Sequence, residues 1–266
     1  MLGYSSVISL LALVSTALGA PSSSIEKRAP IVYLAGDSTM QTAKGAAGWG
    51  AYLHYSLSTT VVNKAIGGRS SRSYTVEGRF TDIINTVKAN DIVVIEFGHN
   101  DGGSLTPTDN GRSVCPGKGT ETCRSTYNGA ATTVYTYPFY LIQAGKALIA
   151  KGAKVIISSP TPNNPWESGA FVYSGSRFVD YSKSVAATLG SNAFYVDHGA
   201  YAAAAWKALG KAKTDAYFVA GDHTHTLPVG ADVVAKSFVK GLQCAGGGFL
   251  KGLVRNSTQS ITGSCI

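Results

Sequence analysis

Two distant segments of the sequence carry residue types that could catalyse acyl transfer. Ser38 follows the short apolar run 31–35, and Asp222 precedes His225 by three residues much later in the chain. A serine hydroxyl attacks an ester only when a base accepts its proton, and His225 is the candidate base. Asp222 would hold the tautomer of this imidazole and stabilise the imidazolium. The pattern predicts a serine hydrolase with Ser38 as nucleophile.

The same chemistry requires hydrogen-bond donors aimed at the oxyanion of the tetrahedral intermediate. The candidate donors are the backbone N–H groups of Ser38 and Gly68 and the side-chain amide of Asn100. Gly68 would let the backbone approach a ligand closely because it has no Cβ. Two alternatives remain, since Gly67 competes for this role and Asn100 could hold an Asx turn instead.

Other chemistries compete for these residues. Ser38 could merely cap a helix, and Asp222, His223 and His225 could ligate a metal. The sequence contains no further His/Asp/Glu cluster of suitable spacing and no H-E-x-x-H, G-x-S-x-G, G-x-G-x-x-G or P-loop motif. We therefore expect no metal and no cofactor.

Apolar runs of strand length alternate with helical patterns along the chain. The expected strands cover residues 31–35, 60–65, 91–97, 154–159 and 193–197. The expected helices cover residues 49–57, 77–88, 135–151, 177–189, 200–209 and 228–242, and residues 101–130 are expected to form a long loop. This alternation predicts an α/β fold, a three-layer α/β/α flavodoxin-like sandwich with a five-stranded parallel sheet. Ligands bind at the carboxyl ends of such strands, where Ser38, Gly68 and Asn100 would meet.

The N-terminal segment predicts export. The apolar run 7–17 is too short to span a bilayer, and it ends near the small-residue pattern A-L-G-A. We expect residues 1–20 to be a signal peptide, residues 21–28 a propeptide ending at the dibasic pair Lys27-Arg28, and residues 29–266 a single domain. The pair could alternatively be a chance feature of a linker. The predicted location is extracellular.

Cysteine usage agrees with an oxidising compartment. The four cysteines allow three pairings. Their spacing favours the local pairs Cys115–Cys123 and Cys244–Cys265. In a secreted chain, Asn256 in Asn-Ser-Thr would be a glycosylation acceptor.

Composition and charge limit the class of partner. The chain of 266 residues is 44% hydrophobic and 14% charged, which excludes disorder as the main state. The net charge of +8 favours polyanions, but the positive residues are scattered rather than clustered. Nucleic acid, an anionic membrane and an acidic polysaccharide are all polyanionic partners, and the scattered charges argue against nucleic acid.

Four blocks of the sequence, in order, resemble those of the GDSL/SGNH hydrolases. They are Gly36-Asp37-Ser38-Thr39, Gly68 in G-G-R-S, Gly98-His99-Asn100-Asp101, and Asp222-x-x-His225. The longer stretches GDSTM, VVNKAIGGRSSRSY, EFGHNDGG, TPNNPWE and GDHTHTLPVGA resemble the fungal rhamnogalacturonan acetylesterases. Thr39 is a departure, since the wider family's name has Leu at this position. The resemblance assigns Ser38, Asp222 and His225 the catalytic roles inferred above.

The resemblance also implies a substrate, acetylated rhamnogalacturonan, which is an acidic polysaccharide. We expect no nucleic acid and no membrane as partner, and a monomer. Arg69, Arg72 and Arg79 could then attract galacturonate carboxylates, or they could form a solvated basic loop. Trp166 could stack on a sugar or anchor its Pro-rich loop. The alternative functions are a GDSL lipase or phospholipase, an acetylesterase acting on another polysaccharide, and a non-catalytic pectin-binding protein.

Overall fold

The computed structural model describes residue 1 and residues 28–43, 45–255 and 263–266. Several expectations therefore lie outside the described residues: the signal peptide beyond Met1, the propeptide up to Lys27, and the glycosylation acceptor Asn256. No helix within the described ranges is both long enough and apolar enough to cross a membrane.

A five-stranded parallel sheet forms the centre of the fold, as predicted. Its strands are β1 (Val32–Gly36), β2 (Val61–Asn63), β3 (Ile92–Glu96), β6 (Lys154–Ser158) and β7 (Ala193–Val196). They are arranged in the order β2-β1-β3-β6-β7, and each neighbouring pair is parallel. The order reverses at β1, so a crevice is expected beyond the carboxyl ends of β1 and β3.

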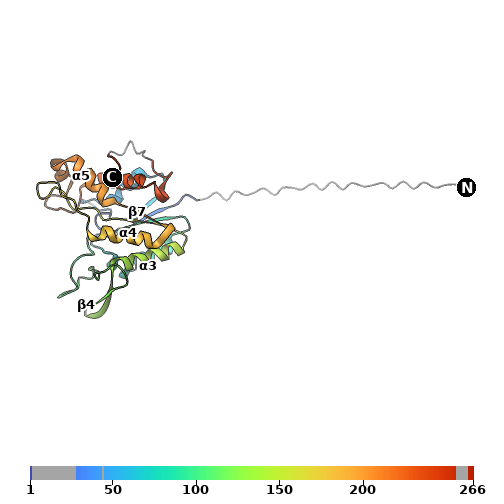
Figure 1. Ribbon diagram of the computed structural model, residues 1–266, viewed down its shortest axis with the longest axis horizontal. Helices are drawn as coiled ribbons and strands as arrows, with labels where there is room; N and C mark the ends of the chain where they lie inside the picture. Colours follow the sequence, from blue (N-terminus) through green and yellow to red (C-terminus); the bar gives the residue numbers. More distant parts are fainter. Residues whose placement is uncertain (2–27, 44, 256–262) are drawn as a thin grey trace.

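Helices cover both faces of this sheet (Figure 1). Successive residues of β1 alternate between two cores, Tyr33 and Ala35 in one and Val32 and Leu34 in the other. The first core is covered by α1 (Ser71–Val76), α2 (Arg79–Thr86), α3 (Tyr137–Ala150) and α4 (Arg177–Leu189). The second is covered by α5 (His198–Leu209), α6 (Lys211–Tyr217), α7 (Pro228–Cys244) and the 3-10 helices η1 (Trp49–Ala51), η2 (Leu53–Ser56) and η4 (Gly248–Leu250). A further 3-10 helix, η3 (Gly190–Asn192), leads from α4 into β7.

The expected long loop at 101–130 contains a β-hairpin that the sequence analysis missed. Strands β4 (Thr122–Tyr127) and β5 (Ala130–Tyr135) pair antiparallel, and the chain continues from β5 into α3 (Figure 1). Asn128 and Gly129 connect them with φ angles of 51° and 78°. Positive φ at both central residues is what a two-residue hairpin turn requires, and Asn-Gly adopts it readily.

One helical expectation is wrong, and the structure adds two short helices. The expected helix at 49–57 is two short 3-10 helices, and α1 and α6 were not expected. Ser70 caps α1 through a reciprocal pair of hydrogen bonds with Ser73, a capping box built from two serines. This local signal begins a helix immediately after the Gly68 turn.

Both disulfides join the pairs that the spacing favours. Cys115 is bonded to Cys123 on β4, and Cys244 at the end of α7 is bonded to Cys265. The first bond attaches the segment after Asn100 to the hairpin. The second holds the C-terminal residues against α7.

Candidate active site

Ser38, His225 and Asp222 form one continuous chain of hydrogen bonds. The distance from His225 Nε2 to Ser38 Oγ is 2.8 Å, and the distance from His225 Nδ1 to Asp222 Oδ2 is 2.6 Å. The fold thus brings together residues 187 positions apart. This geometry allows the imidazole to accept the hydroxyl proton while the carboxylate supports the charge that forms on the ring.

The two carboxylate oxygens of Asp222, in the loop between α6 and α7, have different hydrogen-bond partners. Its Oδ1 accepts the backbone N–H groups of Thr224 and His225 at 2.7 and 3.0 Å, which shapes the turn. Its Oδ2 remains directed at the imidazole. Ala47 and Thr226 exchange backbone and side-chain hydrogen bonds of 2.9 and 2.8 Å, which attach this loop to the segment after Ser38.

The environment of Asp222 keeps its carboxyl group ionised. Partial burial raises its pKa, but the hydrogen bonds from the His225 ring and from the backbone N–H groups of Thr224 and His225 outweigh burial and lower the pKa to about 2. The carboxylate is therefore charged at any pH at which a histidine base can act.

The backbone around Gly68 and Ser38 bears on the expected oxyanion donors. Gly68 has a φ of 74°, a conformation that residues with a Cβ rarely adopt. The N–H of the competing Gly67 is already bonded to Gln41 Oε1 at 2.7 Å. Among the described residues, no hydrogen-bond partner occupies the backbone N–H of Ser38 or of Gly68. Both groups are therefore available to an incoming oxyanion.

Asn100, the third expected oxyanion donor, lies four residues after β3. Its Nδ2 donates to the carbonyl of Arg69 at 3.1 Å, and its Oδ1 accepts from Arg112 Nη1 at 3.2 Å. The contact between Arg112 and Asn100 is not predicted from the sequence, because the segment around Arg112 has no pattern that indicates which residues it meets.

Asp101 joins the Asn100 segment to the start of α1. Its Oδ1 accepts the backbone N–H and the hydroxyl of Ser71 at 2.8 and 2.5 Å, while its buried Oδ2 has no partner within the described part of the chain. Burial raises the pKa of Asp101 to about 7; the Ser71 hydrogen bonds oppose the shift and nearby Asp37 adds to it. Burial also raises the pKa of Asp37, which accepts the backbone N–H and hydroxyl of Thr39.

Asp101→Asn is expected to change how stability depends on pH. The folded protein keeps a proton on Asp101 up to about pH 7, whereas the unfolded chain loses this proton near the ordinary pKa of an aspartate, 3.8. The stability that Asp101 contributes is therefore fully present below this lower value and is lost as pH rises toward 7, by at most about 1.4 kcal/mol per pH unit for one proton. Urea unfolding at pH 4, 5, 6 and 7 should show a flatter dependence for the variant. Parallel curves for the two proteins would contradict a protonated Asp101.

The structure corrects the expectation that Arg72 faces the substrate. The Arg72 side chain is only 2% exposed, and it is held by both oxygens of Asp109 at 2.8 Å and by the Ser113 carbonyl at 2.9 Å. Its guanidinium also lies 5.6 Å from the ring centroid of Tyr127 on the hairpin. Arg72 therefore fastens the 109–113 loop to α1 instead of binding a ligand.

Arg72→Met is expected to destabilise the fold by about 3–5 kcal/mol, because it leaves the buried carboxylate of Asp109 without its cation. Chemical denaturation measures this loss. The double variant Arg72→Met/Asp109→Leu is the control, and it should recover much of the stability because both buried charges are gone. A single variant as stable as the wild type would show that the pair contributes little.

The other proposed sugar contacts are also engaged within the protein. Arg69 Nε bonds both oxygens of Glu77 at 3.2 and 3.1 Å, and Arg79 pairs with the same carboxylate. The indole N–H of Trp166 donates to the Trp206 carbonyl at 2.9 Å, which supports the alternative that Trp166 anchors its loop.

The remaining histidines near the site have structural partners. His99 Nε2 lies 2.9 Å from the Thr161 carbonyl, and His223 Nδ1 lies 3.0 Å from Glu167. Over the described ranges, no group of three or more His, Cys, Asp or Glu residues is arranged to hold a metal ion.

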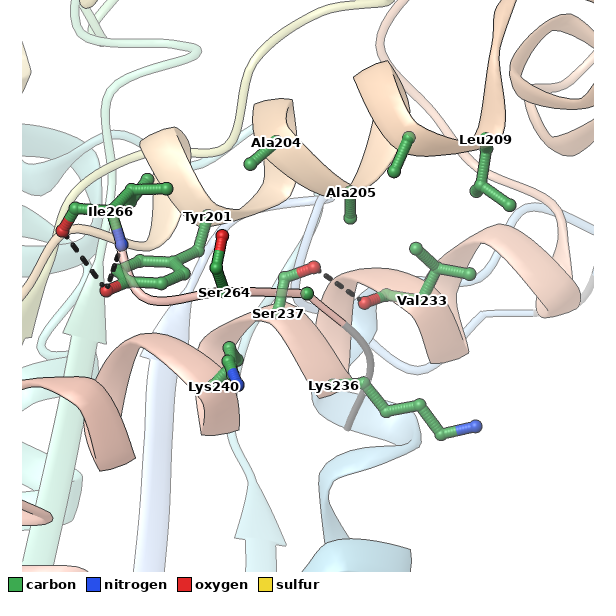
Figure 2. A pocket seen from close by; sticks show the side chains of 12 residues that line it. Tyr201, Ala204, Ala205, Leu209, Val233, Lys236, Ser237, Lys240, Ser264 and Ile266 are labelled. Carbon is green, nitrogen blue, oxygen red and sulfur yellow. Dashed lines mark hydrogen bonds between the residues drawn. The ribbon is translucent and has the colours of Figure 1, made fainter. Parts of the chain in front are cut away.

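Two cavities differ in how close they lie to the candidate catalytic residues. One of about 360 Å³ adjoins the segment before Asn100 and is lined by Gly98, His99 and the Pro-rich loop 160–165. The other, of about 440 Å³, lies between α5, α7 and the C-terminal residues 263–266 (Figure 2). Tyr201 and Ile266 bond to each other at its edge, and none of the triad residues lines it.

Comparison with known proteins places the chain in a family. The profile of the GDSL-like Lipase/Acylhydrolase family matches residues 34–233. The chain is 55% identical to a rhamnogalacturonan acetylesterase of Emericella nidulans over 218 residues, which cover 82% of this chain and 86% of the relative. It is 30% identical to a probable rhamnogalacturonan acetylesterase of Bacillus subtilis over 222 residues, or 80% of this chain and 92% of the relative.

Solved structures share the fold. A Bacillus subtilis protein matches with a TM-score of 0.64 at 21% identity, over 82% of this chain and 57% of that one. An acetylxylan esterase from Geobacillus stearothermophilus matches with a TM-score of 0.54 at 19% identity, over 80% and 94% of the two chains. The chain therefore belongs to the GDSL-like lipase/acylhydrolase family, and it is an ester hydrolase similar over most of its length to rhamnogalacturonan acetylesterases.

Proposed function

We propose that the protein is a serine carbohydrate esterase that removes O-acetyl groups from rhamnogalacturonan in pectin. The observation that carries the mechanism is the pair of short contacts joining Ser38 to His225 and His225 to Asp222. The substrate is proposed from the relatives of 55% and 30% identity that are named for this activity. The net charge of +8 suits an acidic polysaccharide.

The first half of the reaction acylates Ser38. Its oxygen attacks the acetyl carbonyl carbon, and the hydroxyl proton passes to His225 Nε2. The new oxyanion is stabilised by the N–H groups of Ser38 and Gly68 and by the amide of Asn100. When the tetrahedral intermediate collapses, the bond from carbon to the sugar oxygen breaks. His225 gives its proton to that oxygen, so the deacetylated sugar leaves as an alcohol.

The second half releases acetate. Water attacks the acetyl-enzyme while His225 accepts one of its protons, and the same donors stabilise the second oxyanion. Collapse of this intermediate breaks the bond to Ser38, which recovers its proton from His225. Asp222, ionised throughout because of its low pKa, stabilises the imidazolium in both halves.

Secretion is part of the proposal. Residues 1–20 would act as a signal peptide and residues 21–28 as a propeptide, leaving one esterase domain from residue 29 with a glycan acceptor at Asn256. The two disulfides fit maturation in an oxidising compartment. N-terminal sequencing and deglycosylation of the protein exported by a fungal host test both processing sites and the glycan.

Acetate release from a panel of acetylated polysaccharides tests the function. We expect release from acetylated rhamnogalacturonan to exceed release from acetylated xylan and mannan. Acetyl nitrophenyl esters should be cleaved faster than long-chain ones. A preference for long acyl chains would favour a lipase, and a preference for xylan would favour another polysaccharide. Pectin binding without hydrolysis of any ester would indicate a non-catalytic binding protein.

A further inference from the structure

We propose that Arg112 is a positioning residue for the oxyanion site. It fixes the orientation of the Asn100 side-chain amide. This inference rests on the proposed esterase function. An Asn side chain presents an oxygen and an amino group of nearly equal size, so only its partners determine which end points where. In an oxyanion site this choice matters, because the amino group stabilises the negative charge and the oxygen repels it.

The two partners of Asn100 select the same orientation. The carbonyl of Arg69 can only accept a hydrogen bond and contacts Nδ2 at 3.1 Å. The guanidinium of Arg112 can only donate and contacts Oδ1 at 3.2 Å. A flipped amide would place its oxygen against the Arg69 carbonyl and its amino group against the Arg112 cation. Both of those contacts are repulsive.

This arrangement also leaves one donor for catalysis. Nδ2 carries two N–H groups, and the Arg69 carbonyl accepts one of them. The second remains available for the substrate oxygen. Arg69 therefore contributes to the site through its backbone, while its guanidinium is paired with Glu77.

Arg112 lies close to the other expected donor as well. Its Nη1 is 3.9 Å from the point where a Cβ on Gly68 would lie. A positive charge beside both Asn100 and Gly68 would favour the negative charge that develops on the substrate oxygen. Because the Arg112 side chain is exposed, solvent weakens this direct effect, and the orientation of the amide is the larger contribution.

The loop that carries Arg112 is fastened on both sides. Asn110 Oδ1 accepts the backbone N–H groups of Arg112 and Ser113 at 2.8 and 3.0 Å. The buried pair of Arg72 with Asp109 holds the loop before Arg112. After it, the N–H of Val114 donates to the Asp101 carbonyl at 3.1 Å, and the Cys115–Cys123 disulfide follows. The guanidinium therefore extends from an anchored backbone.

An alternative role for Arg112 is direct capture of a galacturonate carboxylate. The two roles differ in the substrates that reveal them. Capture of a carboxylate would affect KM for the acidic polysaccharide and leave a neutral ester unaffected. Positioning of Asn100 would lower kcat for every ester, including 4-nitrophenyl acetate, which carries no carboxylate.

The kinetic test compares Arg112→Ala with Arg124→Ala, a matched control because Arg124 is an exposed arginine on β4. For 4-nitrophenyl acetate we expect Arg112→Ala to lower kcat roughly 10-fold with little change in KM, a smaller loss than the roughly 100- to 1,000-fold expected for Asn100→Ala. Arg112→Lys should retain part of the lost activity, and Arg124→Ala should behave like the wild type.

Double variants separate positioning from an independent effect. If Arg112 acts through Asn100, then adding Arg112→Ala to Asn100→Ala should cause little further loss of kcat. An unchanged kcat for Arg112→Ala on the neutral ester would overturn the proposal, as would a second full loss in the Asn100→Ala background. A change confined to KM for the polysaccharide would instead indicate carboxylate capture and would also overturn it.

A measurement that does not depend on catalysis separates a failure of the proposed esterase function from a failure of the positioning role of Arg112. The side-chain NH₂ signal of Asn100 can be identified in a ¹⁵N spectrum because it is lost in Asn100→Ala. We expect it to shift in Arg112→Ala and to stay in place in Arg124→Ala. A wild-type protein without esterase activity would refute the proposed function, while this signal would still test the contact. A signal unaffected by Arg112→Ala would refute the positioning role.

Discussion

Ser38→Ala is expected to lower kcat for acetyl esters by roughly 10⁴- to 10⁶-fold while leaving the protein folded. The variant lacks the oxygen that forms the acetyl-enzyme, so only the oxyanion donors and substrate binding remain to assist attack by water. Acetate release and nitrophenyl acetate hydrolysis at saturating substrate measure the loss.

Ser168→Ala is a matched control, since it removes the hydroxyl of an exposed serine that bonds the nearby Ala170 carbonyl. It should retain full activity. A serine-directed organophosphate should add one adduct to the wild type and to Ser168→Ala but none to Ser38→Ala, as mass spectrometry can show. A Ser38→Ala variant within 10-fold of the wild type would refute Ser38 as nucleophile.

Asp222→Asn is expected to lower kcat roughly 10⁴-fold. In the wild type, Asp222 Oδ2 accepts the N–H of His225 Nδ1, which leaves Nε2 free to accept the Ser38 proton. An amide group at that position favours the opposite tautomer, with the proton on Nε2, and the ring then cannot act as a base. The Oδ1 contacts that shape the turn can persist, so the loss should fall on kcat instead of folding.

Asp215→Asn provides the control for Asp222→Asn. Asp215 is an exposed carboxylate that bonds Lys211 and Asn164, so its loss should leave kcat unchanged. Circular dichroism and thermal unfolding should show both variants folded. If Asp222→Asn retained kcat within 10-fold of the wild type, Asp222 would not be the group that orients His225.

The sequence predicted those parts of the fold that depend on local patterns. Apolar runs bounded by glycine or polar residues identified the five parallel strands, and helical spacing identified α4 closely. The hairpin at β4 and β5 could also have been predicted, because Asn128-Gly129 is a strong turn signal. The many polar residues of this hairpin and its exposed position made the segment resemble a loop.

The environments of the arginines near the site could not be predicted from the sequence. Arg69, Arg72 and Arg79 look alike in the sequence, which predicts the same role for each of them. The structure buries Arg72 against Asp109, pairs the other two with Glu77, and places the unnoticed Arg112 beside Asn100. No local pattern distinguishes these environments, because each depends on a carboxylate or an amide positioned by the chain elsewhere.

The sequence by itself determined the five parallel strands, the longer helices between them, the chemical types of the candidate catalytic residues, and the strand ends that they follow. Only the tertiary structure decided which of these groups touch, which N–H groups remain unpaired, and which charges are buried. Strand and helix periodicity arises from backbone geometry over a few residues, so it is visible locally. Burial and hydrogen-bond pairing at the site arise from contacts such as the one between Ser38 and His225, which exists only once the sheet and its loops have assembled.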